Sequence, residues 1–179
     1  MERPSLEVTS VAQWRDWLTT NHATSDGIWL VTFKKAFEGH VPYPALVEQA
    51  LCFGWVDSQA RAVDAERTSI TMTPRREGSR WMQPNRDRVE RLEAQGLMTD
   101  AGRAAIAAAK ASGAWDDLRP VEALEVPADL GKAIAQHDLH STWDALTRSA
   151  KFQHLLRLHD AKRPATRERH VAKIVDALR

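Results

Sequence analysis

The chain has 179 residues, of which 43% are hydrophobic and 27% charged, as in a soluble globular protein with one ordinary domain and room for a helical appendage. The net charge of +1 argues against a protein that binds polyanions over its whole surface, and the single cysteine, Cys52, excludes an internal disulfide. No segment approaches the roughly 18 apolar residues of a membrane span, and the N-terminus lacks a signal-peptide pattern. We therefore expect a cytoplasmic protein without membrane insertion.

The first third of the chain predicts a helix, a strand and a second helix. Ser10 is placed to cap the first helix, with Gln13 in the capping-box position. The apolar run Ile28 to Lys35 indicates a buried strand. Pro44 suits the first turn of the second helix, which Gly54 is placed to end.

Two strands follow, "WVDSQARAV" and "TSITMTP", around a turn at residues 64–67. In the second strand Ile70 and Met72 alternate with small polar residues, a pattern typical of a strand with one buried face. Helices before and after strands of these lengths indicate an α+β fold, a small antiparallel sheet with helices packed on one face.

The remainder of the chain predicts helices. Asn85 is expected to cap one that ends at Gly96, and Asp100 an alanine-rich one. A connector with two prolines then precedes segments with helical periodicity only, the last starting near Thr166. We predict an α+β domain over residues 1–118 and an all-helical C-terminal module over residues 119–179.

Polar residues gather around the tryptophans that follow the second predicted helix. Asp57 lies early in one strand and Arg75 and Arg76 end its partner, so the three are expected to meet at one edge of the sheet. Paired guanidinium groups before a Gly-Ser turn offer forked donors and backbone N–H groups to a carboxylate or phosphate. The predicted ligand-binding residues are Trp55, Asp57, Arg75, Arg76, Ser79, Trp81 and Asn85. A buried Asp–Arg bridge under Trp81, with a purely architectural role, explains the same pattern.

Other kinds of site find little support. The spacings of His137 and His140, and of His154 and His159, complete no ligand set, so we expect no metal and no cofactor. Ser79 lacks the nucleophile elbow of a serine hydrolase, and Cys52 sits among apolar neighbours as a small hydrophobic residue. Arginines between Arg75 and Arg91 are interleaved with acids, which disfavours nucleic acid as a partner.

The segments "ALCFGWVDS", "TPRREGSRWMQPNRDRVERLEAQGLMTDAG" and "AKRPATRERHVAKIVDAL" resemble the YdeI/OmpD-associated family, whose members are also described as bacteriocin-protection proteins. The resemblance implies an α+β fold with a helical C-terminal part. By the family's name, it also implies an association with an outer-membrane porin and protection against bacteriocins or cationic antimicrobial peptides. It implies no established enzymatic reaction.

Three hypotheses follow from these observations. The first is a non-enzymatic stress- or bacteriocin-protection protein that binds an anionic ligand or peptide at the Asp/Arg/Trp site. The second is a small-molecule enzyme with Asp57 as general base and Arg75 and Arg76 as anchors for an anionic substrate. The third is a nucleic-acid module that uses the basic C-terminal helix. We favour the first; the second requires Asp57 and the arginines to line one open cavity.

Overall fold

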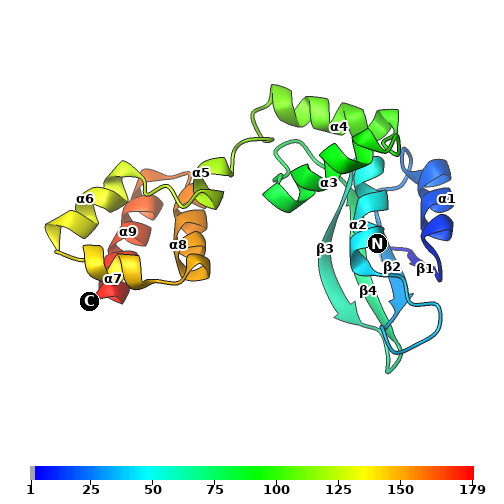
Figure 1. Cartoon of the computed structure of the whole chain (residues 1–179), viewed down its shortest axis with the longest axis horizontal. Helices are drawn as coiled ribbons and strands as arrows, with labels where there is room; N and C mark the ends of the chain where they lie inside the picture. Colours follow the sequence, from blue (N-terminus) through cyan, green and yellow to red (C-terminus); the bar gives the residue numbers. More distant parts are fainter. Residues whose placement is uncertain (1–2) are drawn as a thin grey trace. The chain divides into compact units, whose positions relative to one another are not determined.

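The computed structural model describes residues 3–179, which divide into an N-terminal unit that ends at Asp116 and a C-terminal unit from Asp117 to Arg179. Within the described residues, the N-terminal unit combines one sheet with helices and the C-terminal unit holds helices alone (Figure 1). The predicted α+β fold followed by a helical part is confirmed.

The sheet of the N-terminal unit has the spatial order β1-β2-β4-β3. Its strands, in chain order, are β1 (Ser5–Glu7), β2 (Ile28–Phe33), β3 (Trp55–Ala62) and β4 (Arg67–Pro74). β4 pairs antiparallel with β2 and with β3, but β1 runs parallel to β2. The prediction of a purely antiparallel sheet is therefore wrong at this edge, because a strand of three residues is too short to show a periodic pattern.

Both faces of β4 are covered, so the prediction of one buried and one open face is also wrong. Ser69 and Thr71 are buried, as is Met72 on the other face. The neighbours on the adjacent strands explain why Ser69 and Thr71 are buried, since Thr71 lies opposite Trp29 and Ser69 opposite Arg61. The Arg61 guanidinium lies 3.8 Å from the centroid of the Trp29 ring, and this stacked pair shields the small polar residues between the two side chains.

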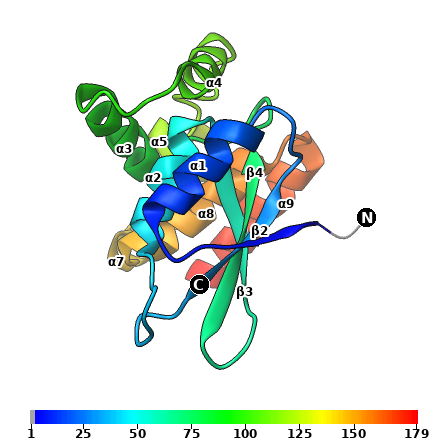
Figure 2. The same ribbon diagram turned by 90° about the vertical axis from the view of Figure 1, so that its right-hand side faces the viewer.

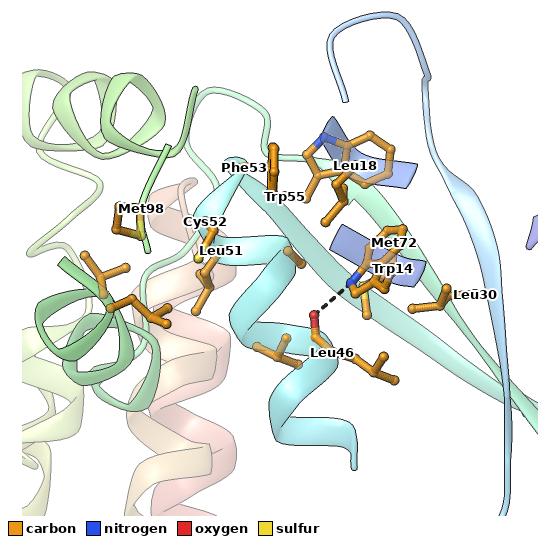
Figure 3. Packing of buried hydrophobic residues seen from close by; sticks show 14 of the residues in the cluster. Trp14, Leu18, Leu30, Leu46, Leu51, Cys52, Phe53, Trp55, Met72 and Met98 are labelled. Carbon is orange, nitrogen blue, oxygen red and sulfur yellow. Dashed lines mark hydrogen bonds between the residues drawn. The ribbon is translucent and has the colours of Figure 1, made fainter. Parts of the chain in front are cut away.

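Two helices, α1 (Val11–Asn21) and α2 (Tyr43–Cys52), pack on one face of the sheet (Figure 2). The Ser10 hydroxyl accepts a hydrogen bond from the Gln13 backbone N–H at 3.2 Å, as predicted for the cap of α1. The Gln13 side-chain oxygen accepts a hydrogen bond from the Thr9 backbone N–H, whereas a capping box predicts this bond at the next residue, Ser10. The Trp14 indole N–H donates to the Leu46 carbonyl at 3.0 Å and joins the two helices (Figure 3).

The core of the N-terminal unit lies between these helices and the sheet (Figure 3). Its least exposed large side chains come from both layers and include Trp14, Leu18, Ile28, Leu30, Leu51, Trp55 and Met72. Trp14, Trp17 and Trp55 contact one another through their rings at centroid distances of 5.5 to 6.2 Å. Most of the unusual tryptophan content is therefore explained by packing.

The helices α3 (Gln83–Ala94) and α4 (Asp100–Ala111) pack against the C-terminal end of α2. α3 begins at Gln83, and its N-cap is Met82 instead of the predicted Asn85. Proline suits the first turn of a helix, so the helix includes Pro84 instead of beginning after it. α4 is capped by Thr99 instead of Asp100, and the Thr99 hydroxyl also donates to the Cys52 carbonyl at 2.6 Å. This bond ties the start of α4 to the end of α2.

The C-terminal unit consists, within the described residues, of α5 (Arg119–Glu122), α6 (Ala128–Gln136), α7 (His140–Ala145), α8 (Arg148–Asp160) and α9 (Pro164–Leu178). α9 packs against α6 and α8. Ile174, Val175 and Leu178 of α9 are buried, as the periodicity predicts, although the helix begins at Pro164, before the expected start near Thr166. None of the helices in residues 3–179 is both long enough and apolar enough to cross a membrane.

Candidate functional site

The chain leaves β4 through a tight turn that positions the two predicted arginines. The Arg75 backbone N–H donates to the Gly54 carbonyl at 2.9 Å and extends the ladder between β3 and β4 by one step. The Ser79 hydroxyl then accepts from the Arg76 N–H at 3.0 Å, and the Ser79 N–H donates to the Arg76 carbonyl at 3.0 Å. Gly78, with φ of +74°, permits this closure. Contrary to the sequence-based expectation, these backbone N–H groups donate to oxygens of the chain itself and are not available to a ligand.

The guanidinium group of Arg75 lies flat against Trp81, with 3.7 Å between its central carbon and the ring centroid. Its Nη1 donates to the Arg80 carbonyl at 3.0 Å. Its Nε and Nη2 are buried without a hydrogen-bond partner. Burial lowers the pKa of Arg75 to about 10, against the raising effect of the Asp57 carboxylate. Arg75 is therefore still a cation at neutral pH, but one with two unmet donors.

Trp81 is held rigidly beneath this cation. Its side chain is 1% exposed, and its ring packs against that of Trp115 at a centroid distance of 4.9 Å. The Trp81 carbonyl accepts a hydrogen bond from Arg86, which is itself 1% exposed and also donates to the Gln83 side chain at 2.6 Å. The burial of Arg86 could not be predicted from the sequence, because Arg86 and its neighbouring arginines in α3 share the same pattern of alternating charge.

A cavity of about 240 Å³, here named the Arg75 pocket, opens beside this stack. One wall is the segment after β4, and the other is α4 with the residues that follow it. The lining residues are Arg75, Arg76, Glu77, Gly78, Ser79, Trp81, Ala105, Ala108, Ala109, Ser112 and Ala114. The pocket thus brings together four of the seven predicted residues, and adds an alanine wall whose composition predicted only a helix.

Two glycines allow α4 to lie close enough to α2 to form this wall. A Cβ atom on Gly102 would lie 2.3 Å from the Cys52 carbonyl oxygen, and one on Gly54 would lie 2.9 Å from the Ala105 Cβ. Gly54 also has a φ of +72°, which favours glycine. The pocket therefore depends on close contact between the backbones of α2 and α4.

Asp57 does not join the Arg75 pocket. Its carboxylate accepts a hydrogen bond from the Tyr43 hydroxyl at 2.7 Å, and no ion pair links it to an arginine in the described part of the chain. The register explains the separation, because Asp57 lies opposite Met72, whereas alternation directs Arg75, three residues further on, to the other face. Within the described residues Asp57 makes no ion pair with either arginine, so the predicted buried Asp–Arg bridge is wrong, although the Asp57 carboxylate lies near enough to raise the pKa of Arg75.

Trp55 and Asn85 also lie outside the pocket lining. Trp55 belongs to the tryptophan cluster of the core, and its indole N–H donates to the His22 carbonyl at 3.3 Å. The Asn85 side chain accepts from Arg88 at 3.1 Å within α3. Both residues therefore make contacts that support the fold, and none of these contacts involves Arg75.

The contact between Tyr43 and Asp57 gives a prediction that absorbance can test, because Tyr43 is the only tyrosine of the chain. Burial first, and then the Asp57 carboxylate, raises the pKa of Tyr43 to about 12. An ultraviolet titration should therefore show phenolate formation near pH 12, and at lower pH in Asp57→Asn. Since the folded-state pKa lies above the unfolded value, the associated stability is complete below pH 10 and is lost towards pH 12. A midpoint near 10, with the native circular dichroism spectrum intact at that pH, would contradict the contact.

The described residues contain no group of three or more His, Cys, Asp or Glu side chains arranged to hold a metal ion. His159 hydrogen-bonds the Asp117 carboxylate at 2.8 Å. Cys52 is fully buried, and burial raises the pKa of its thiol, which keeps it in the unreactive protonated form.

Comparison with known proteins assigns each unit to a family model. Residues 6–105, more than half of the chain, match a domain of unknown function, DUF8412, and residues 123–179 match the model described as "Bacteriocin-protection, YdeI or OmpD-Associated". No curated protein and no solved structure matches the chain. The resemblance expected from the sequence is confirmed, although the match under that description lies in the C-terminal unit. The chain belongs to the DUF8412 family and carries a YdeI/OmpD-associated, bacteriocin-protection domain at its C-terminal end.

Proposed function

We propose that this chain is a non-enzymatic, bacteriocin-protection-type protein whose Arg75 pocket binds a small carboxylate or a carboxylate-bearing peptide. The observation that carries the proposal is the Arg75 side chain, a cation with buried Nε and Nη2 atoms that lack hydrogen-bond partners. A buried charged donor without a partner costs about 1–3 kcal/mol or more, so an acceptor supplied by a ligand would offset a cost that the free protein bears.

The shape of the guanidinium group favours a carboxylate. Nε and Nη2 form one edge of the planar group, and a carboxylate can accept from both atoms of such an edge in parallel. The edge is shielded while the group lies on Trp81, so the guanidinium must slide along the ring to meet its ligand. The Trp81 face allows this movement, because a stacked cation has no fixed hydrogen-bond geometry to break there.

The remainder of the lining restricts the ligand further. Glu77 brings a negative charge to the pocket, which disfavours dianions such as phosphate esters relative to a monoanion. Ala105, Ala109 and Trp81 supply an apolar surface beside the cation. A carboxylate with a small apolar group, free or at the end of a peptide, satisfies both parts of the pocket.

The enzymatic hypothesis receives no support from this geometry. It requires Asp57 to act as a general base on a substrate that Arg75 and Arg76 anchor, but Asp57 does not line the pocket. Its carboxylate accepts a hydrogen bond from the Tyr43 hydroxyl instead. The name of the matched C-terminal model also suggests an association with a porin, which we propose is indirect for a protein that works inside the cell.

A survival assay tests the protective role. A strain that lacks the gene, challenged with bacteriocin, should be protected by the native chain and not by Arg75→Met. Arg61→Met is a matched control, because Arg61 also stacks on an indole, that of Trp29, but lies outside the pocket. We expect Arg61→Met to protect as the native chain does. Full protection by Arg75→Met would separate the role from the pocket, and absence of protection by the native chain would refute the role itself.

A further inference from the structure

The C-terminal unit contains a second concave site, a groove of about 460 Å³ between α8 and α9. Its lining residues are His154 and Arg157 from α8, and His170, Lys173, Ile174 and Ala177 from α9. This groove, here named the α8–α9 groove, lies wholly within the residues that match the YdeI/OmpD-associated model, and it is independent of the Arg75 pocket.

The lining of the α8–α9 groove is cationic. Arg157 and Lys173 carry permanent charges, two histidines add titratable ones, and no carboxylate belongs to the lining. Within residues 3–179, neither Arg157 nor Lys173 makes an ion pair. By contrast, Arg167 of the same helix pair binds the Asp129 carboxylate through Nε and Nη2 at 2.5 and 2.9 Å. The groove therefore concentrates positive charge that the protein itself does not neutralise.

The two histidines of the groove differ in their contacts. His170 Nδ1 lies 3.1 Å from the Arg157 backbone carbonyl, so Nδ1 carries a proton and Nε2 is left for another partner. The His154 ring is half-buried and packs near Trp143 of α7. Burial, followed by the charge of Arg157, lowers the pKa of His154. His154 is therefore neutral in the free groove at neutral pH, and a bound anion would favour its protonation.

We propose that the α8–α9 groove binds the phosphate group of a phosphate ester or phosphorylated lipid. Arg157 offers a planar fork and Lys173 a point charge, from two different helices, to the oxygens of one dianion. Protonated His154 adds a further donor. Ile174, which is 3% exposed, and Ala177 form an apolar floor for the organic part of the ligand. The absence of a carboxylate from this lining distinguishes it from the Arg75 pocket, where Glu77 disfavours a dianion.

The proposal predicts proton-linked binding. The charged or titratable groups in the lining are Arg157 beside His154 on α8, and His170 and Lys173 on α9, while α7 contributes the uncharged Trp143. Uptake of a proton by His154 should strengthen binding as the pH falls from 8 to 6.5, by about tenfold. Below about pH 6 the phosphate monoester itself gains a proton, which opposes any further increase.

Calorimetry on the full chain tests the proposal with inorganic pyrophosphate as the soluble probe, and co-sedimentation with phosphatidylcholine vesicles with and without phosphatidic acid tests the lipid source. Lys173→Gln should weaken binding at least tenfold. Arg169→Gln is the matched control, because Arg169 is an exposed α9 cation outside the lining, and it should bind as the native chain does. Binding of pyrophosphate alone identifies a soluble ligand, and binding that requires phosphatidic acid identifies a lipid headgroup.

Three outcomes would overturn the proposal. The first is absence of binding to both probes at pH 6.5. The second is equal loss of binding in Lys173→Gln and Arg169→Gln, which would indicate general attraction to a basic helix. The third is an affinity for pyrophosphate that does not change between pH 8 and pH 6.5, or that changes equally in His154→Gln, because His154 would then make no contribution.

Discussion

Gly102→Ala should destabilise the N-terminal unit by about 2 kcal/mol or more, although alanine is normally better than glycine inside a helix by about 1 kcal/mol. The added Cβ would lie 2.3 Å from the Cys52 carbonyl oxygen and 2.8 Å from its carbon, and backbone atoms cannot turn aside as a side chain can. α4 would have to move away from α2, and the alanine wall of the Arg75 pocket would move with it.

Denaturant unfolding followed by tryptophan fluorescence measures this effect, because every tryptophan except Trp143 belongs to the N-terminal unit. Gly131→Ala is the matched control. Gly131 also lies inside a helix, α6, but its added Cβ would meet only Val126 Cγ1 at 3.8 Å. We expect Gly131→Ala to stabilise its own helix by about 0.5–1 kcal/mol and to leave the unfolding midpoint of the N-terminal unit unchanged. An unchanged unfolding midpoint in Gly102→Ala would show that α2 and α4 do not approach as closely as described.

Arg75→Met should abolish carboxylate binding while leaving the fold stable. A hydrogen bond to a charged group contributes about 1.5–3 kcal/mol, so loss of two such bonds predicts at least about a 100-fold loss of affinity. Stability should change by less than about 1 kcal/mol, because removal of two buried unpaired donors offsets the loss of the cation–π contact with Trp81. Methionine keeps an apolar stem of similar length over the ring.

Calorimetric titration with N-acetylalanine measures the affinity of the native chain, of Arg75→Met and of the stacked-arginine control Arg61→Met. Because the pKa of Arg75 is about 10, binding by the native chain should be constant from pH 6 to 8 and fall as the pH rises through 10. Equal affinity in Arg75→Met would remove Arg75 from the site. A large loss of stability in that variant, with the stability of Arg61→Met unchanged, would show that Arg75 stabilises the fold instead of binding a ligand.

Strands and helices with strong local patterns were predictable from the sequence. The apolar run of β2, the alternation in β4 and the Ser10 cap each depend on neighbouring residues alone. β1 was missed because it is short and takes its place only by pairing with β2. The burial of Ser69 and Thr71 was missed because the cover comes from Trp29 and Arg61 on other strands.

The candidate site was predictable only in part, for a related reason. Arg75, Arg76, Ser79 and Trp81 are close in sequence and meet around one turn, so a local pattern identified them together. Asp57 was assigned to them by the proximity of two strand ends, but the side-chain direction depends on register, which the sequence did not specify. The α4 wall arises from the contact of Gly102 with Cys52, and alanines carry no chemical signal of a binding site.

A crystal structure of the native chain grown with N-acetylalanine tests the central claim most directly. We predict a carboxylate within hydrogen-bond distance of both Nε and Nη2 of Arg75, with its apolar group against Ala105 and Ala109. Protein oxygens bonded to those two nitrogens, or a carboxylate bound elsewhere while they stay shielded, would contradict the claim that Arg75 receives an anion.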